Sequence, residues 1–204
     1  MPPRSVRSAS VFASRHLPAP PGSLVHELLG RYGESHRAYH NASHIAAVLR
    51  WFDWTWDETG WDQPADVYAA ILFHDAIYDP QRKDNEARSA ELAGLHGASE
   101  RAQALIHLTA RHGQLAPSDV DRDAANFLDS DTAILGADAA VFDAYDAAIR
   151  REYAGIPAED YRVGRRAFLS NMLARPRIFL GDLFHAKLDA AARANLTRAV
   201  ARYA

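Results

Sequence analysis

The chain has no cysteine and few residues that favour β-strands. Its 204 residues include 40 Ala but only 22 Val, Ile and Thr together. The absence of Cys excludes disulfides, thiolate metal sites and a cysteine nucleophile. Because Ala is the best helix former and β-branched residues favour strands, the composition predicts an all-α fold. Any metal site would then be built from His, Asp and Glu.

The chain also lacks a strong net charge and a long apolar run. Its 23 basic and 26 acidic residues give a net charge of −3, so nothing indicates a general affinity for nucleic acid or anionic membrane. No stretch approaches the ~18 apolar residues of a membrane span, and the N-terminus has no secretory signal pattern. We therefore expect a soluble cytoplasmic protein with no nucleic-acid or membrane partner. The pattern predicts no particular oligomeric state.

The first 23 residues differ in composition from the rest. They contain three Arg, five Ser, five Pro and no acidic residue, which predicts a flexible N-terminal arm over residues 1–23 and also fits an organelle transit peptide. From Leu24 onward, apolar residues recur every three or four positions without a linker or repeat. A single helical domain over residues 24–204 is therefore predicted. Its expected helices cover residues 24–32, 41–57, 63–78, 84–95, 99–112, 117–135, 139–153, 158–173 and 182–203.

One conspicuous polar pair is His74-Asp75, within a mostly apolar segment. With 10 His and 18 Asp, about one His-Asp dipeptide is expected by chance, so the pair alone is uninformative. On the expected helix, however, both side chains have mostly apolar neighbours at three and four residues. A buried ionised Asp needs a cation, a hydrogen-bond network or a metal, and adjacent helix positions about 100° apart can converge on one ion. A core His-Asp hydrogen bond is the alternative.

Two further segments supply candidate ligands. Asp131 has only large apolar residues at three and four positions and is expected to face inward, whereas Asp129 has a surface-like set of neighbours. A helix cap or a solvated acid is the alternative for Asp131. Asn41 is a good N-cap, which puts His44 in the first helical turn and His40 just before it. Both imidazoles could then face one cleft, although a structural His is the alternative for each.

These residues resemble the metal-binding pattern of the HD-domain superfamily of metal-dependent phosphohydrolases, which is all-helical. The similarity is to uncharacterised predicted phosphohydrolases with strings like Tyr39-His40-Asn41-Ala42-Ser43-His44, Phe73-His74-Asp75-Ala76-Ile77-Tyr78-Asp79-Pro80, Asp84-Asn85-Glu86 and Phe127-Leu128-Asp129-Ser130-Asp131. The resemblance implies an HD-domain-like helical bundle. It also implies that His44, His74, Asp75 and Asp131 hold a divalent metal, which could be Mn, Fe, Co, Ni, Zn or Mg.

The same resemblance implies two catalytic residues. The string from Tyr39 to His44 is similar to the first motif of cyclic-nucleotide phosphodiesterases, in which the first His is the general acid, so His40 is expected to protonate the leaving oxygen. Asp79 occupies the place of a catalytic acidic residue in guanosine-tetraphosphate hydrolases of this superfamily. A bound metal can lower the pKa of its water toward about 7, and Asp79 could orient that water.

Four more polar residues are candidates for contacts with substrate or around the metal. The resemblance implies that Glu86 could support the metal site or reach a second metal, although capping the next helix is the simpler interpretation. It also implies that His112 could add a metal or phosphate ligand; the alternative is a helix C-terminal His favoured by the dipole. Arg82 and Lys83 could meet substrate phosphate, or be solvated loop charges.

Together these features predict divalent-metal-dependent hydrolysis of a phosphate ester. The expected partner is a small phosphorylated molecule such as a nucleotide. One alternative keeps the site and changes the chemistry: an HD-type di-iron oxygenase, with His112 or Glu86 completing a two-metal cluster. The other is a non-catalytic helical module that binds a nucleotide or a partner.

Overall fold

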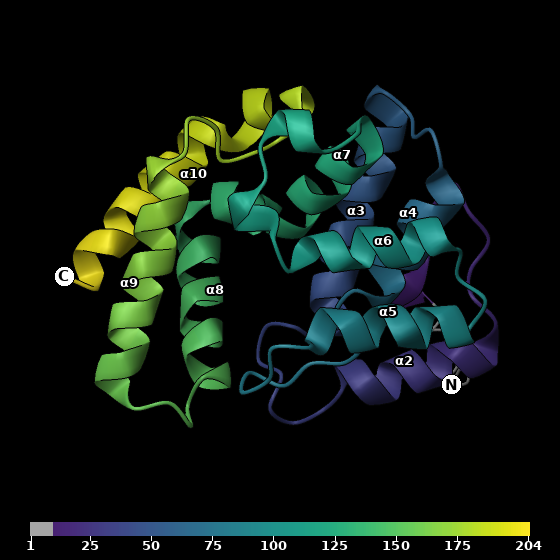
Figure 1. Ribbon diagram of the computed structural model, residues 1–204, viewed down its shortest axis with the longest axis horizontal. Coiled ribbons are helices and arrows are strands. Elements are labelled where there is room, and N and C mark those ends of the chain that lie inside the picture. Colours follow the sequence, from purple (N-terminus) through teal and green to yellow (C-terminus); the bar gives the residue numbers. More distant parts are fainter. Residues whose placement is uncertain (1–9) are drawn as a thin grey trace, which may run out of the picture. The chain divides into compact units, whose positions relative to one another are not determined.

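The structure is a computed structural model that describes residues 10–204, and every regular element within that range is helical (Figure 1). The predicted all-α class is confirmed, while its HD-domain-like character stays a prediction. The chain forms two compact units, the first ending at Arg111 and the second covering His112–Ala204. The single domain expected over residues 24–204 is not tested by this division and stays a prediction. In the described part of the chain, no helix combines the length and apolar character needed to cross a membrane.

From Ser10 onward, the first unit contains five α-helices and a short 3-10 helix. In chain order they are η1 (Ser10–Phe12), α2 (Gly22–Tyr32), α3 (Ala42–Glu58), α4 (Pro64–Phe73), α5 (Asn85–Leu95) and α6 (Glu100–Thr109). Helix α4 packs against α3, α5 and α6 and carries apolar residues on all sides, so its last four residues are all buried. The end of this helix therefore delivers the next residues, His74 and Asp75, into the unit's interior.

The segment that follows the first nine residues packs onto this unit. Phe12 is fully buried, and its carbonyl accepts a hydrogen bond from the Tyr68 hydroxyl. Ser14 donates to the carboxylate of Asp53 on α3 at 2.6 Å. Of the arm predicted over residues 1–23, residues 1–9 lie outside the described range, and the part from Ser10 to Ser14 is anchored to α3 and α4.

The second unit contains four α-helices and three short 3-10 helices. They are η2 (His112–Gln114), η3 (Pro117–Asp119), α7 (Arg122–Thr132), η4 (Ala133–Gly136), α8 (Ala139–Glu152), α9 (Ala158–Ala174) and α10 (Asp182–Arg202). Helix α10 packs on η4, α9 and α7. Eight successive residues of α7, from Asp123 to Ser130, are buried, so this helix has no solvated face along most of its length.

Three predicted helices are shorter in the structure than the sequence suggests. The helix expected over residues 63–78 ends at Phe73, because the amide of Ala76 turns back to the Phe73 carbonyl and the amide of Ile77 donates to the Ser89 hydroxyl. The helix expected over 99–112 ends at Thr109. The one expected over 117–135 is divided, because the side chain of Asp121 caps a new helix, α7.

Close backbone packing at Gly136 gives a test of the second unit. A Cβ added there would lie 2.7 Å from the Leu188 Cβ and 2.9 Å from the Leu188 carbonyl oxygen, whereas one at Gly164 on α9 would meet nothing within 4 Å. We expect Gly136→Ala to lower the free energy of unfolding by ~1–3 kcal/mol through overpacking. Gly164→Ala, the matched control, should raise it by ~0.5–1 kcal/mol. Urea unfolding measures both, and equal effects would contradict the packing described.

Candidate metal centre

Three donor side chains of the first unit meet where α3 begins and α4 ends. Asn41 caps α3 as predicted, its side chain accepting from the Ser43 amide at 2.9 Å, and this fixes His44 in the first turn. His74 directly follows α4, and Asp75 lies in the turn beyond it. The predicted helical spacing of His74 and Asp75 is therefore wrong. The two side chains approach each other because the chain turns out of the helix directly after Phe73.

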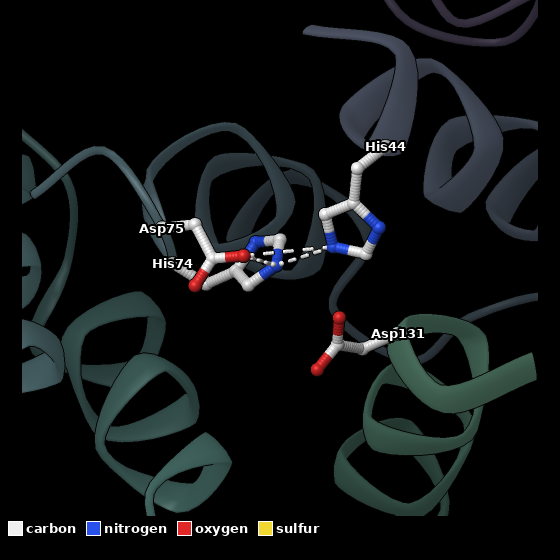
Figure 2. Close-up of side chains that lie close together, drawn as sticks. All are labelled: His44, His74, Asp75 and Asp131. Atoms are coloured by element: carbon white, nitrogen blue, oxygen red, sulfur yellow. Dashed lines mark hydrogen bonds and ion pairs between the residues drawn. The ribbon is translucent and has the colours of Figure 1, made fainter. Parts of the chain in front are cut away.

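The donor atoms lie close enough to share one ion (Figure 2). The Nε2 atoms of His44 and His74 are 3.2 Å apart. Asp75 Oδ2 lies 3.1 Å from His74 Nε2 and 3.6 Å from His44 Nε2. Ligand atoms about 2.1 Å from a metal are about 3.0 Å apart as neighbours in an octahedron and about 3.4 Å apart in a tetrahedron. The three separations match the edges of such a coordination shell.

A hydrogen bond to the main chain sets the tautomer of His74. Its Nδ1 lies 3.0 Å from the carbonyl oxygen of Ile71, which can only accept, so Nδ1 carries a proton. In the neutral ring, Nε2 then presents a lone pair to the carboxylate of Asp75. Two acceptor atoms at 3.1 Å need a cation between them, either a proton or a metal. A backbone partner on the far ring nitrogen is also the usual support of a metal-bound His.

The electrostatics of the cluster favour bound positive charge. Burial by itself raises the pKa of Asp75, but the nearby rings of His74, His40 and His44 outweigh it and bring the pKa below its usual range. The carboxylate is therefore ionised. The C-terminal end of α4 favours a cation here, whereas the N-terminal end of α3, which carries His44, opposes one. Imidazole and carboxylate ligands together suit a transition metal better than calcium.

His40 lies beside the donor atoms without joining them. Its ring centroid is 5.8 Å from that of His44, 4.4 Å from that of Tyr78 and 5.1 Å from that of Tyr39. Among the described residues, the group able to hold a metal does not include His40. The arrangement places one further imidazole next to the cluster.

Asp79 and Glu86, the other acidic site candidates of the first unit, are outside the group of donor atoms that could share one ion. Asp79 is exposed and lies outside any helix, and its carboxylate accepts from the Gln81 amide at 2.9 Å. Arg82 is exposed and pairs with Asp84 through two hydrogen bonds. Lys83 is exposed, and Glu86 is half-buried in the first turn of α5. Roles for these four in catalysis or substrate binding stay predictions.

Asp131 belongs to the second unit, near the end of α7, and is half-buried. Its neighbour Asp129, predicted to be surface-like, is fully buried, so that prediction is wrong. The carboxylate of Asp129 accepts from the amides of Leu180 and Gly181 at 2.8 and 2.7 Å. Those partners lie some fifty residues along the chain, and helical spacing around Asp129 could not reveal them.

His112 is also buried in the second unit. It opens η2 instead of ending a helix, and within residues 10–204 its Nε2 has no hydrogen-bond partner, lying 3.9 Å from Asp129 Oδ1. Burial is the main cause that lowers the pKa of His112 to about 4, with Arg175 adding to the effect and Asp131 opposing it. Burial likewise raises the pKa of Asp129 to about 7, against the two amide hydrogen bonds.

Sequence reasoning missed one residue of the first unit that contacts both sides of the site. Arg37 donates to the main-chain carbonyls of His40 and Asp75, yet no spacing or motif distinguishes it from a solvated loop arginine. Only its position three residues before His40 could have drawn attention to it.

Comparisons with protein-family models, with curated proteins and with solved structures found no match.

The buried His112 predicts a specific dependence of stability on pH. Its unfolded pKa is about 6.5, whereas the folded protein keeps it neutral down to about pH 4. Unfolding therefore takes up a proton between these values, and this contribution to stability is lost as pH falls. When the pH falls from 7.5 to 5, the free energy of unfolding should decrease by about 2 kcal/mol less in His112→Gln than in wild type.

Urea unfolding at the two pH values measures this difference. The raised pKa of Asp129 acts in the opposite direction, but it is present in both proteins and cancels from the comparison. Exposed His107 supplies the control, His107→Gln. An identical pH dependence in wild type and His112→Gln would contradict a buried neutral ring.

Proposed function

We propose that this protein is a metal-dependent phosphohydrolase that cleaves a phosphate ester of a nucleotide or another small phosphorylated molecule. The observation that carries the proposal is the meeting of two imidazole nitrogens and one ionised carboxylate oxygen within 3.6 Å, with the proton of His74 held on the far nitrogen. Such a donor set, next to an additional His outside the set, suits hydrolysis with a bound metal. The resemblance to HD-domain phosphohydrolases supports the same function.

In this proposal, Asp131 completes the ligand set begun by His44, His74 and Asp75, as the resemblance to HD-domain phosphohydrolases implies. The support for Asp131 is its half-buried carboxylate near the end of α7 and its order in the sequence after the other three ligands. Two His and two Asp leave positions free for water and substrate, as catalytic sites require and closed structural sites do not. The metal would be Mn, Fe, Co, Ni, Zn or Mg.

When bound, the metal supplies two effects: it lowers the pKa of a coordinated water toward about 7 and polarises a phosphoryl oxygen. The residues of the protein orient the ligands, donate the proton and attract the substrate. The Ile71 carbonyl holds the His74 ring in the tautomer that presents Nε2. His40, next to the ligands and held by Tyr78 and Tyr39, donates a proton to the departing alkoxide oxygen. Arg82 and Lys83, both exposed in the loop after the site, are proposed to attract the substrate phosphate.

Metal analysis of the purified chain, followed by assays with phosphomonoesters and phosphodiesters and added Mn²⁺, tests the proposal. We expect stoichiometric metal and turnover of at least one ester class. Absence of metal would refute it. Two irons per chain with oxygen consumption would support the oxygenase, and bound metal without turnover of any ester would support a binding module.

Removal of one ligand should abolish metal binding. We expect His44→Ala to weaken Mn²⁺ binding by more than about 100-fold, since loss of even an outer partner of a ligand costs 10–100-fold. Wild type should gain about 2.7 kcal/mol of stability at a metal concentration 100 times the Kd, and His44→Ala should gain almost none. Titration calorimetry and thermal unfolding measure both effects. His26→Ala, at an exposed position of α2, is the control and should behave as wild type.

Removal of the proposed general acid should separate metal binding from catalysis. His40→Ala should bind Mn²⁺ with wild-type affinity, because His40 is outside the donor group, but should lose about 10²- to 10⁴-fold in kcat. The loss should be smaller for an ester whose leaving group needs no protonation, such as a nitrophenyl ester. Loss of metal from His40→Ala would refute the role assigned to it.

A further inference from the structure

Arg37 joins two segments that lie far apart in the sequence. Its side chain is fully buried, and Nη1 donates to the carbonyl oxygens of His40 and Asp75 at 3.1 and 2.6 Å. Nη2 donates to the carbonyl of Ala76 at 3.1 Å. One guanidinium thus ties the loop that carries His40 to the turn that carries Asp75.

The guanidinium is itself held in place from several directions. Its Nε donates to the carboxylate of Glu34 at 2.8 Å. Its central carbon lies 5.3 Å from the ring centroid of Tyr32 and 5.4 Å from that of Tyr78, within the range of cation–π attraction. Because Tyr78 also contacts the His40 ring, Arg37 supports His40 both through its main chain and through its ring neighbour.

We propose that Arg37 is a positioning residue that sets the distance between the general acid His40 and the metal ligand Asp75. This inference rests on the proposed function. It assigns a role to Arg37, which is not itself a metal ligand. Misplacement of a catalytic group by about 1 Å can cost 10²-fold in rate, so a residue that sets this distance affects turnover without touching the substrate.

Lysine cannot take over the role. The planar guanidinium carries five N–H donors in a fixed fork and here serves three carbonyls and one carboxylate at once. An ammonium group has three donors at one point and cannot reach both segments with the same geometry. Arg37→Lys therefore keeps the buried charge but loosens the link between the two segments.

A double-mutant cycle tests the proposal through activity. We expect Arg37→Lys to lower kcat roughly 10- to 100-fold while KM and Mn²⁺ affinity change less than about threefold. In a His40→Ala background the same change should cost less than about threefold in kcat, because the group that it positions is gone. Equal losses in both backgrounds would show a general structural role and overturn the proposal. Arg31→Lys, which alters only an ion pair with Glu27 on α2, is the control.

A second measurement needs neither metal nor substrate. In NMR spectra of the metal-free protein, nuclear Overhauser contacts between the ring protons of His40 and Tyr78 should be present in wild type and Arg31→Lys and lost in Arg37→Lys. If these contacts persist in Arg37→Lys, the positioning role is wrong whether or not the protein hydrolyses esters. If they are lost but wild type has no hydrolase activity, the proposed function fails while the placement of His40 by Arg37 stands.

A milder variant covers the case in which Arg37→Lys does not fold. Glu34 is 46% exposed, so Glu34→Ala removes one partner of Arg37 without leaving a buried cavity. It should weaken the His40–Tyr78 ring contacts and lower kcat about threefold in the wild-type background but not with His40→Ala. Unchanged contacts and kcat in Glu34→Ala would overturn the proposal.

Discussion

The candidate site depends on how helix α4 ends inside an apolar environment. A largely apolar helix whose last four residues are all buried stops at Phe73, and the next two residues are polar. The C-terminal carbonyls of a buried helix need partners, and Ile71 finds one in the ring of His74. This bond fixes which nitrogen of His74 faces Asp75 and His44. The termination of one helix thereby creates both the donor geometry and the demand for positive charge that define the site.

Much of the fold follows from features that are local in the sequence. The Asn41 cap, the apolar stripes and the Gly and Pro residues at helix ends predicted nearly every helix of the described chain. The failures occur where a turn is stabilised by remote groups. The sequence pattern predicted a helix that continues to Tyr78, but the Ser89 hydroxyl on another helix binds the amide of Ile77 and supports an earlier end. No property of residues 74–78 alone encodes that partner.

The sequence predicted that three donor residues meet, but it did not predict the local structure that brings them together. His44, His74 and Asp75 lie together as expected, although the turn that brings them together replaces the helix on which their convergence was predicted. Asp129 was misjudged and Arg37 was missed for a related reason: each is a buried polar group that also bonds to backbone atoms of a distant segment. Backbone partners carry no signature in residue identity, so a sequence pattern cannot show them.

The bond between Asp129 and the amides of Leu180 and Gly181 has a consequence for redesign. A Cβ at Gly181 would lie 2.6 Å from the Asn126 side chain, so a larger residue there would push the loop away from α7. Asp131 is two residues from Asp129 on the same helix. A library intended to alter the properties of Asp131 should therefore keep both Gly181 and Asp129 unchanged.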